Sequence, residues 1–323
     1  MRYRTLGTGG PLVSAVGLGC LGMSGGYGPA DPAECEATIR HGLDLGITLL
    51  DTADFYGAGA NEELVGRAIS GRREEVVLAT RGGLRAAVPG GPPTIADGSP
   101  GRLRQACEAS LRRLGTGHVD IYYLGRVDPA VPVEESVGAL AELVAEGKIR
   151  HVGLSEATAE QLRRAHAVHP LTAVESEYSL WERHVEDDIL PTVRELGIGF
   201  TAHTPLGKGF LAGALVTTDQ LGPGDHRRNH PRFQGENFRR NRRLIAEAEE
   251  ASAETGLPLA TLALAWLLSR GPEIVPIPGT RRRTHLEANA AAADHLITPE
   301  QADRLAALVP PALVSGSRQP VRR

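Results

Sequence analysis

Aromatic residues, thiols and an excess of positive charge are all scarce in this chain. Phe, Trp and Tyr together make up 4% of its 323 residues, and there are only three cysteines, Cys20, Cys35 and Cys107. An odd number of cysteines without CxxC spacing argues against a disulfide framework or a zinc site, so we expect buried, reduced thiols. With 35 Lys and Arg against 39 Asp and Glu, neither nucleic acid nor an anionic membrane surface is an expected partner.

Long apolar runs are also missing. No stretch approaches the roughly 18 apolar residues that a membrane span requires, and the N-terminus has no apolar signal-peptide core, which predicts a cytoplasmic protein. The proportions of 41% hydrophobic and 23% charged residues are those of a folded globular chain. We expect one domain over residues 1–311, followed by a polar, flexible tail over residues 312–323.

The hydrophobic pattern alternates between short runs rich in Val, Ile and Leu and longer segments of helical periodicity. This alternation predicts repeated βα units, and eight runs predict a closed (β/α)8 barrel, known as a TIM barrel. The eight expected strands cover residues 15–19, 47–51, 76–80, 119–124, 150–155, 172–175, 198–204 and 274–278. An N-terminal hairpin is expected around the turn at residues 7–11, and extra helices at the C-terminal end.

Helix start signals support this division of the chain. Asp31 and Ser99 each precede a proline, as capping residues often do, and Thr158 with Gln161 fits a capping box. Thr298 with residue 301 repeats the box before a final helix. The polar stretch over residues 213–237 is too long for a routine connection and is expected to be either a functional lid or disordered.

Reactive groups in such a barrel come from the C-terminal ends of the strands. The second expected strand ends in the sequence LDTADFYG, which contains Asp51 and Tyr56. A buried carboxylate at a strand end and a phenol five residues later can point into the same small volume. Taken alone, the motif would favour a capping aspartate and a loop tyrosine.

Several further segments accompany this motif in a fixed order. They are GLGCLGMS (residues 17–24), VVLAT (76–80), GLSEA (153–157), ESEYSLW (175–181), PLGKGFLAG (205–213), RFQGENF (232–238) and IPGTRRR (277–283). From about residue 2 to about residue 310, the chain resembles the aldo-keto reductase family. The resemblance implies a (β/α)8 barrel that binds NADP(H) across its C-terminal face without a Rossmann motif.

The resemblance also implies a catalytic tetrad of aspartate, tyrosine, lysine and histidine, and it assigns the first two to Asp51 and Tyr56. Arg81 stands where the family has its lysine, so it retains the positive charge with a different geometry. Gly125 stands where the family has its histidine and supplies no donor. Loss of one positioned acid or base typically costs roughly 10²–10⁴ in rate.

Further departures concern the nicotinamide end of the cofactor. Glu175 replaces the glutamine that holds the carboxamide, and it cannot donate to the carboxamide oxygen. His203 replaces the aromatic residue that stacks on the ring, whereas Ser155, the other carboxamide partner, is retained. Because Glu175 and His203 are titratable, they join Asp51, Tyr56 and Arg81 as catalytic candidates.

The resemblance implies that two loops hold the phosphates of NADP(H). Backbone amides, a hydroxyl and cations are suited to that task. The residues concerned are Leu206, Gly207 and Lys208 in one loop and Gly279, Thr280 and Arg281 in the other. Asn289 matches an asparagine that contacts adenine, while Ala288 stands where a glutamate is usual. The expected substrate pocket is lined by loop residues after the strands: Tyr27, Phe55, Gly125, Arg126 and Trp181.

Three functions fit these observations. The first is NADP(H)-linked reduction of a carbonyl or related group on a small molecule, in specialised biosynthesis, with an altered centre. The second is a non-redox acid/base conversion in the same pocket: dehydration, isomerisation or cyclisation. The third is a non-catalytic NADP(H)-binding sensor. No metal site is expected, and the sequence leaves the substrate and the oligomeric state open.

Overall fold

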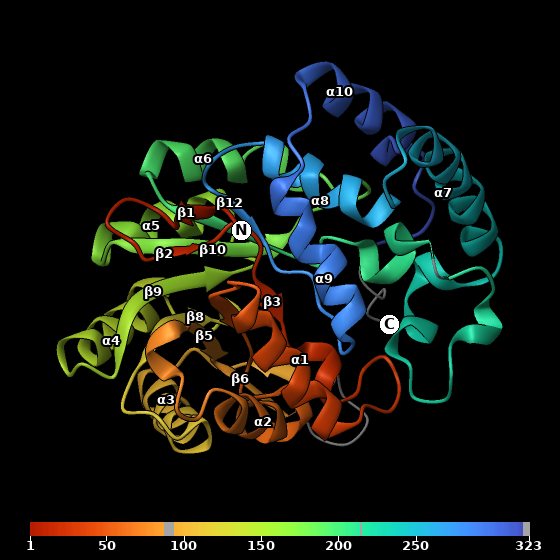
Figure 1. Ribbon diagram of the computed structural model, residues 1–323. Coiled ribbons are helices and arrows are strands. Elements are labelled where there is room, and N and C mark those ends of the chain that lie inside the picture. Colours follow the sequence, from red (N-terminus) through yellow and green to blue (C-terminus); the bar gives the residue numbers. More distant parts are fainter. Residues whose placement is uncertain (87–93, 214, 319–323) are drawn as a thin grey trace.

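The computed structural model describes residues 1–86, 94–213 and 215–318 and contains a barrel of eight parallel strands (Figure 1). The strands are β3 (Leu18–Gly19), β4 (Leu49–Asp51), β5 (Val77–Gly82), β8 (Val119–Leu124), β9 (Ile149–Ser155), β10 (Leu171–Glu177), β11 (Gly199–His203) and β12 (Ile274–Pro276). Each pairs with its neighbour in this order. The first and last strands meet through a parallel bridge between Gly19 and Gly279, which closes the barrel.

The eight predicted runs each coincide with one of these strands, so the predicted (β/α)8 fold is confirmed. All six residues of β8 and all seven of β10 are buried, as expected for parallel strands covered on both sides. The predicted N-terminal hairpin is also present, as β1 (Tyr3–Thr5) paired with β2 (Leu12–Ser14). Val13 of β2 and Leu6, which follows β1, pack with residues that line the inside of the barrel, so the hairpin fills the end opposite the C-terminal ends of the strands.

Helices surround the barrel and follow the expected start signals (Figure 1). They are α1 (Pro32–Asp44), α2 (Ala60–Ala68), α3 (Pro100–Leu114), α4 (Val133–Ala145), α5 (Ala159–Val168), α6 (Ile189–Leu196), α7 (Gly235–Thr255), α8 (Leu259–Ser269), α9 (Arg283–Ala291) and α10 (Pro299–Leu308). Asp31 caps α1, and Thr158 and Thr298 form complete capping boxes. Ser99 does not cap α3 with its side chain, because its hydroxyl donates to Asp97.

Two connections add to the βα pattern near the C-terminal ends of the strands. A short hairpin, β6 (Leu84–Ala86) and β7 (Thr94–Ala96), follows β5. Residues 215–234 form short turns and contact the loop after β3, where the backbone amide of His226 donates to the carbonyl of Gly26 at 2.8 Å.

The C-terminal segment also lies against the barrel. Asn241 in α7 exchanges two hydrogen bonds with the backbone of Ser315, and Arg318 forms an ion pair with Glu156 at 2.5 Å. The remaining residues of the expected flexible tail, 319–323, lie outside the described residues. No helix in the described part of the chain is long and apolar enough to cross a membrane.

Candidate active site

The C-terminal end of β4 carries the first two candidates. Asp51 is its last residue and is buried, and Tyr56 begins the 3-10 turn η2 (Tyr56–Gly59). Thr52 donates to the side-chain oxygen of Asn61 at 2.6 Å, and the amide nitrogen of Asn61 donates to the carbonyl of Cys20 at 2.9 Å. These bonds fix the turn after β4 against the turn after β3, which holds Tyr56 at the C-terminal face of the barrel.

Arg81, near the end of β5, is shared by two carboxylates. Its Nη2 donates to Oδ1 of Asp51, and its Nη1 donates to Oε1 of Glu175 at 2.5 Å. The exposed fractions are 3% for Asp51, 5% for Arg81 and 0% for Glu175. The second oxygens, Oδ2 of Asp51 and Oε2 of Glu175, have no hydrogen-bond partner among the described residues. One guanidinium between two ionised carboxylates leaves a surplus negative charge in a buried place.

Burial therefore controls the protonation of this triad. It raises the pKa of Glu175 to about 7, although the charge of Arg81 acts in the opposite direction. It also raises the pKa of Asp51 against the same opposing charge. The two carboxyl groups also act on each other directly, since the charge of Asp51 raises the pKa of Glu175 and a hydrogen bond with Glu175 lowers that of Asp51. They therefore titrate as a pair that holds a proton near neutral pH.

Tyr56 lies beside this triad. The Cζ atom of Arg81 is 5.8 Å from the centre of the Tyr56 ring. Burial raises the pKa of the phenol, and the nearby charge of Arg81 opposes that rise. The hydroxyl of Tyr56 has no hydrogen-bond partner among the described residues. Tyr56 is thus a neutral phenol next to a cation, which is the state of a potential proton donor.

The end of β8 places Gly125 and Arg126 next to this group. The backbone amide of Gly125 donates to the carbonyl of Gly82 at 2.7 Å, and a Cβ atom at position 125 would lie 3.0 Å from that oxygen. A side chain at position 125 would therefore crowd the end of β5. Arg126 is half-buried, and its Nη1 donates to the carbonyl of Gly125 at 3.2 Å.

A second cluster forms around Glu156, directly after β9. Glu156 adopts a left-handed backbone conformation with φ of 56°. Its carboxylate accepts from Nε2 of His203 at 2.7 Å and from Nη2 of Arg318 at 2.5 Å. Burial opposes its ionisation, but His203 and Arg318 hold the pKa of Glu156 well below its usual range. The ring of His203, expected to stack on nicotinamide, is thus oriented by Glu156 and, through Nδ1, by Thr204.

Glu156 and Arg318 are absent from the sequence-predicted site. Glu156 follows Ser155 in the GLSEA segment, so its position just after a strand could have indicated it. Arg318 lies 162 residues further along the chain and had no comparable signal. The hydroxyl of Ser155, by contrast, has no hydrogen-bond partner among the described residues, although Ser155 is only 1% exposed.

The first expected phosphate loop forms a tight turn after β11. Gly207, Lys208 and Gly209, which follow Leu206, have positive φ values of 56°, 57° and 92°. A Cβ atom at position 207 would lie 3.2 Å from Nε1 of the buried Trp181, so the glycine permits close packing as well as the turn. Nζ of Lys208 lies 3.4 Å from Oε1 of Glu177.

The second expected phosphate loop begins where the barrel closes. Gly279 pairs with Gly19, and the hydroxyl of Thr280 donates to the carbonyl of Arg282 at 3.3 Å. Arg281 donates to the carbonyls of Gly28 at 3.0 Å and Pro29 at 2.6 Å, which ties it to the loop after β3.

Asn289 lies in α9, which follows this loop. It is 5% exposed, and its amide makes no hydrogen bond with the described residues.

These features fit NADP(H). Among the residues that the resemblance assigns to the cofactor, Glu175 has a buried oxygen, Oε2, without a hydrogen-bond partner in the described part of the chain. Buried polar groups are normally paired, so such groups indicate positions where a ligand supplies the partner. The fit is weaker at Lys208 and Arg281, because both already contact oxygen atoms of the protein.

The other residues expected to line the substrate pocket lie in two different environments. The ring centre of Tyr27 is 4.4 Å from that of His226, and the ring centre of Phe55 is 4.8 Å from that of Tyr56. Both belong to loops that follow strands. Trp181 is 2% exposed and stacks on Phe210 at 4.7 Å, so it belongs to the hydrophobic packing below the turn at residues 207–209. Its place in a substrate pocket stays a prediction.

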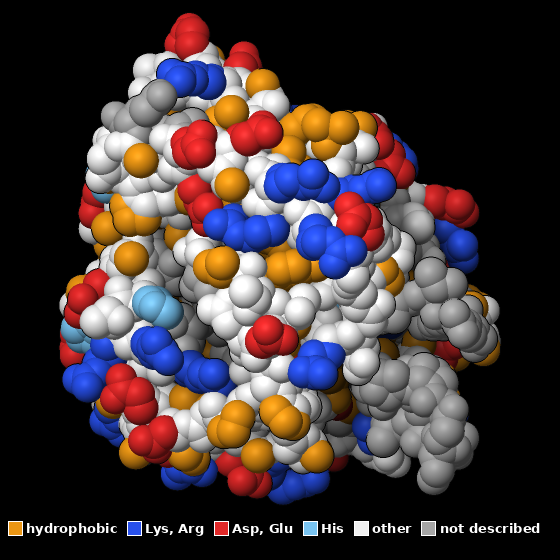
Figure 2. Space-filling view, turned by 90° about the vertical axis from the view of Figure 1, so that its right-hand side faces the viewer, with side chains coloured by type: hydrophobic (Ala, Val, Ile, Leu, Met, Phe, Trp, Pro, Cys, Tyr) orange, Lys and Arg blue, Asp and Glu red, His pale blue; other side chains and the backbone are white. Residues whose placement is uncertain are grey.

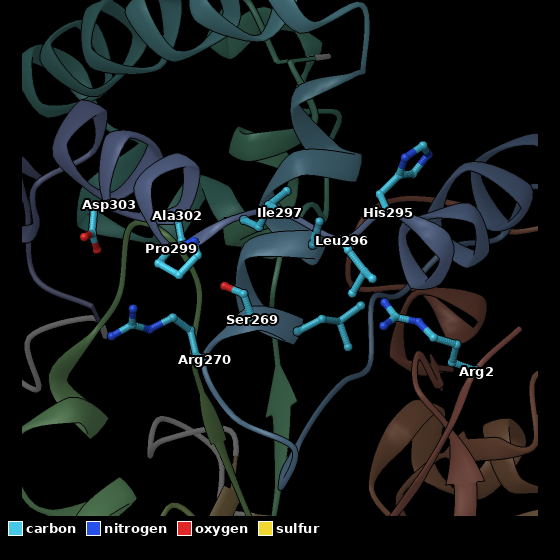
Figure 3. A pocket seen from close by; sticks show the side chains of 11 residues that line it. Arg2, Ser269, Arg270, His295, Leu296, Ile297, Pro299, Ala302 and Asp303 are labelled. Atoms are coloured by element: carbon cyan, nitrogen blue, oxygen red, sulfur yellow. The ribbon is translucent and has the colours of Figure 1, made fainter.

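Other surface features lie away from these residues. A cavity of about 260 Å³ lies between the end of α8 and the start of α10 and is lined by Arg2, Ser269, His295 and Asp303, among others (Figure 3). Arg2 precedes β1 and Ser269 precedes β12, so this cavity lies at the end opposite the candidate site. On the face shown in Figure 2, basic and acidic side chains alternate. This agrees with the ion pairs that Glu236 makes with three arginines of α7.

A closed barrel with convergent titratable groups at its strand ends defines a TIM-barrel protein of the enzyme type. A model of the Aldo/keto reductase family matches residues 15–310. The chain therefore belongs to the aldo-keto reductase family, whose members are oxidoreductases acting on small molecules.

Solved structures of this family are similar over nearly the whole chain. The glycerol dehydrogenase of Gluconobacter oxydans is 29% identical, with a TM-score of 0.85 over 99% of this chain and 98% of its own. An aldo/keto reductase from Klebsiella pneumoniae, in complex with NADP and acetate, is 28% identical, with a TM-score of 0.74 over 99% of both chains. The holo form of an aldo-keto reductase from Bacillus halodurans is 27% identical, with a TM-score of 0.79 over both complete chains.

Proposed function

We propose that this protein is an NADP(H)-dependent, cytoplasmic oxidoreductase that reduces a carbonyl group on a small molecule, with Tyr56 as the proton donor. One observation carries the proposal: Arg81 pairs with Asp51 and lies 5.8 Å from the centre of the Tyr56 ring. A neutral phenol next to a fixed guanidinium can release its proton to a developing alkoxide, because the cation stabilises the phenolate that remains. The NADP complex of the Klebsiella pneumoniae relative supports the choice of cofactor.

In this proposal the bound cofactor supplies a hydride to the carbonyl carbon. The hydroxyl of Ser155 and the amide of Asn289 would contact its nicotinamide and adenine ends. Tyr56 donates its proton to the carbonyl oxygen, so that the product is a neutral alcohol, and it regains a proton from water afterwards. Asp51 holds the guanidinium of Arg81 in the place where it can stabilise the phenolate.

Glu175 makes this centre sensitive to pH. While its carboxyl group is protonated, the charge of Arg81 is balanced by Asp51 alone. When Glu175 ionises, a second negative charge contacts the same guanidinium, and the phenolate of Tyr56 becomes harder to form. The reduction is therefore expected to be favoured below the pKa of Glu175, which is about 7.

A second candidate function is a non-redox acid/base conversion in the same pocket. The observation that favours it is the unpartnered Oε2 of Glu175, together with a pKa of about 7 that allows this group to give or accept a proton near neutral pH. Dehydration and isomerisation both require such a group. Neither needs the hydride of a cofactor.

Cofactor binding and one variant test these functions. We expect NADPH to bind purified protein with micromolar affinity by calorimetry and to change its nicotinamide fluorescence. Tyr56→Phe should keep this binding and lose roughly 10²–10⁴ in the rate of NADPH-dependent reduction. If an adenine nucleotide without nicotinamide binds equally well and NADPH is not consumed with any carbonyl substrate, the non-redox function takes precedence.

A further inference from the structure

Arg126 is a cation without an anionic partner in the described part of the chain. It is half-buried, and its single hydrogen bond goes to the carbonyl of Gly125 at 3.2 Å. The neighbouring cations are all paired with acids: Arg81 contacts Asp51 and Glu175, and Arg318 contacts Glu156. Arg126 is thus the unusual member of this group.

The acids around Arg126 do not neutralise it. Burial lowers the pKa of Arg126, and the charges of Arg81 and Arg318 act in the same direction against the attraction of Glu156. Glu156 is already bound by His203 and by Arg318. A partly desolvated guanidinium that stays charged and unpaired is unfavourable, and an anionic ligand would remove that cost.

The position of Arg126 is next to the proposed reacting centre. β8 pairs with β5 so that Tyr123 lies opposite Arg81, and on its other side β8 pairs with β9, which ends at Ser155. Arg126 comes two residues after the end of β8. Gly125 has no side chain that could separate Arg126 from the carbonyl site. An anion on Arg126 would therefore lie beside a carbonyl group that Tyr56 protonates.

We propose that the substrate carries a carboxylate next to or near its carbonyl group, and that Arg126 binds this carboxylate through its planar fork. The inference rests on the proposed function, because it concerns the same pocket. A guanidinium and a carboxylate match in geometry and can form two parallel charge-assisted hydrogen bonds. Arg126 is then a determinant of substrate class, whereas Tyr56 carries out the proton transfer.

The first test uses binding alone. Succinate is titrated calorimetrically into wild type, Arg126→Gln and the control Arg85→Gln, with the uncharged succinamide as a matched ligand. Arg85 is exposed, lies in the nearby hairpin strand β6 and faces Asp97 at 3.5 Å. We expect Arg126→Gln to weaken succinate binding by about 10- to 100-fold, the range of a charge-assisted pair, and the control to leave it unchanged. Succinamide should bind weakly and equally to all three proteins.

The second test uses turnover. Succinic semialdehyde and butanal differ by one carboxylate, and their kcat and KM are compared with NADPH as reductant. Arg126→Gln should raise the KM for succinic semialdehyde about 10- to 100-fold more than it changes the KM for butanal, and Arg126→Lys should recover part of that difference. The control Arg85→Gln should leave the constants for both aldehydes unchanged. A merely structural role would affect both substrates alike.

The two tests separate the possible failures. If succinate binding depends on Arg126 but NADPH is never consumed, the anion site stands and the redox function fails. If wild type and Arg126→Gln bind succinate equally and do not distinguish the two aldehydes, the carboxylate site is refuted, whatever the reaction is.

Discussion

Replacing Glu175 by glutamine tests the electrostatics of the centre through the stability of the protein. The pKa of this buried carboxyl is raised from 4.5 to about 7. A carboxyl group that binds its proton more tightly in the folded state stabilises the fold at low pH. This contribution is fully present at pH values below the pKa that the carboxyl group has in the unfolded chain. It is lost as the pH rises through the pKa that the group has in the folded protein. Glutamine keeps the shape and cannot ionise.

The expected size follows from the same shift. One pKa unit corresponds to about 1.4 kcal/mol, so wild type should lose about 2 kcal/mol of this contribution between about pH 5.5 and about pH 8.5. We therefore compare the free energy of unfolding of Glu175→Gln with that of wild type at each pH. The variant minus wild-type difference should be about 2 kcal/mol larger at about pH 8.5 than at about pH 5.5. The comparison of the two proteins at each pH removes the effect of all other titrating groups.

The assay is urea unfolding followed by the fluorescence of Trp181 and Trp266, both of which are buried. The control is Glu134→Gln, because Glu134 is partly exposed and the bond from Arg164 at 2.8 Å keeps its pKa below the usual value. This control should change stability little and equally at both pH values. A stability difference between Glu175→Gln and wild type that stays constant with pH would show that Glu175 is ionised throughout, and would refute the assigned protonation.

Three further predictions concern the same site. The kcat for reduction should fall as the pH rises through about 7, and Glu175→Gln should flatten this profile; an unchanged profile would remove Glu175 from the control of activity. Arg81→Lys should lower the free energy of unfolding by about 1–3 kcal/mol in urea titrations, because one ammonium cannot replace the fork that contacts both carboxylates; full stability would contradict the shared guanidinium. Asn289→Ala should weaken NADPH binding by about 10-fold in fluorescence titrations, the cost of about one hydrogen bond, and leave the melting temperature unchanged, because its amide has no partner in the described protein.

The barrel could be predicted because its signals are local. Each strand is a short apolar run, and residues such as Asp31, Thr158 and Thr298 mark helix starts within a few positions. The hairpin of β6 and β7, with strands at residues 84–86 and 94–96, is not among the elements that the sequence predicts. The contacts of the C-terminal segment with α7 are likewise invisible in the sequence, since they join residues 74 positions apart.

The site could be predicted in part for the same reason. Asp51 and Tyr56 lie within one strand end and its turn, so their proximity follows from local structure. The bond between Arg81 and Glu175 joins residues 94 positions apart and depends on how the barrel brings β5 and β10 together. The resemblance predicts His203 at the cofactor ring. Its contact with Glu156 could not be predicted, because it joins the end of β11 to the residue after β9, which are 47 positions apart.

The two departures at Arg81 and Glu175 are best understood together. A lysine has one compact charge and needs one acidic partner, which Asp51 would provide. An arginine has a fork with two directions, and its second arm requires an acceptor, which glutamate provides better than glutamine because its oxygens only accept. The pair of Arg81 and Glu175 is thus self-consistent, and it changes what the centre can do. With Glu175 protonated the triad is neutral, and with Glu175 ionised it carries one negative charge, so a site that would be fixed in charge becomes titratable near pH 7.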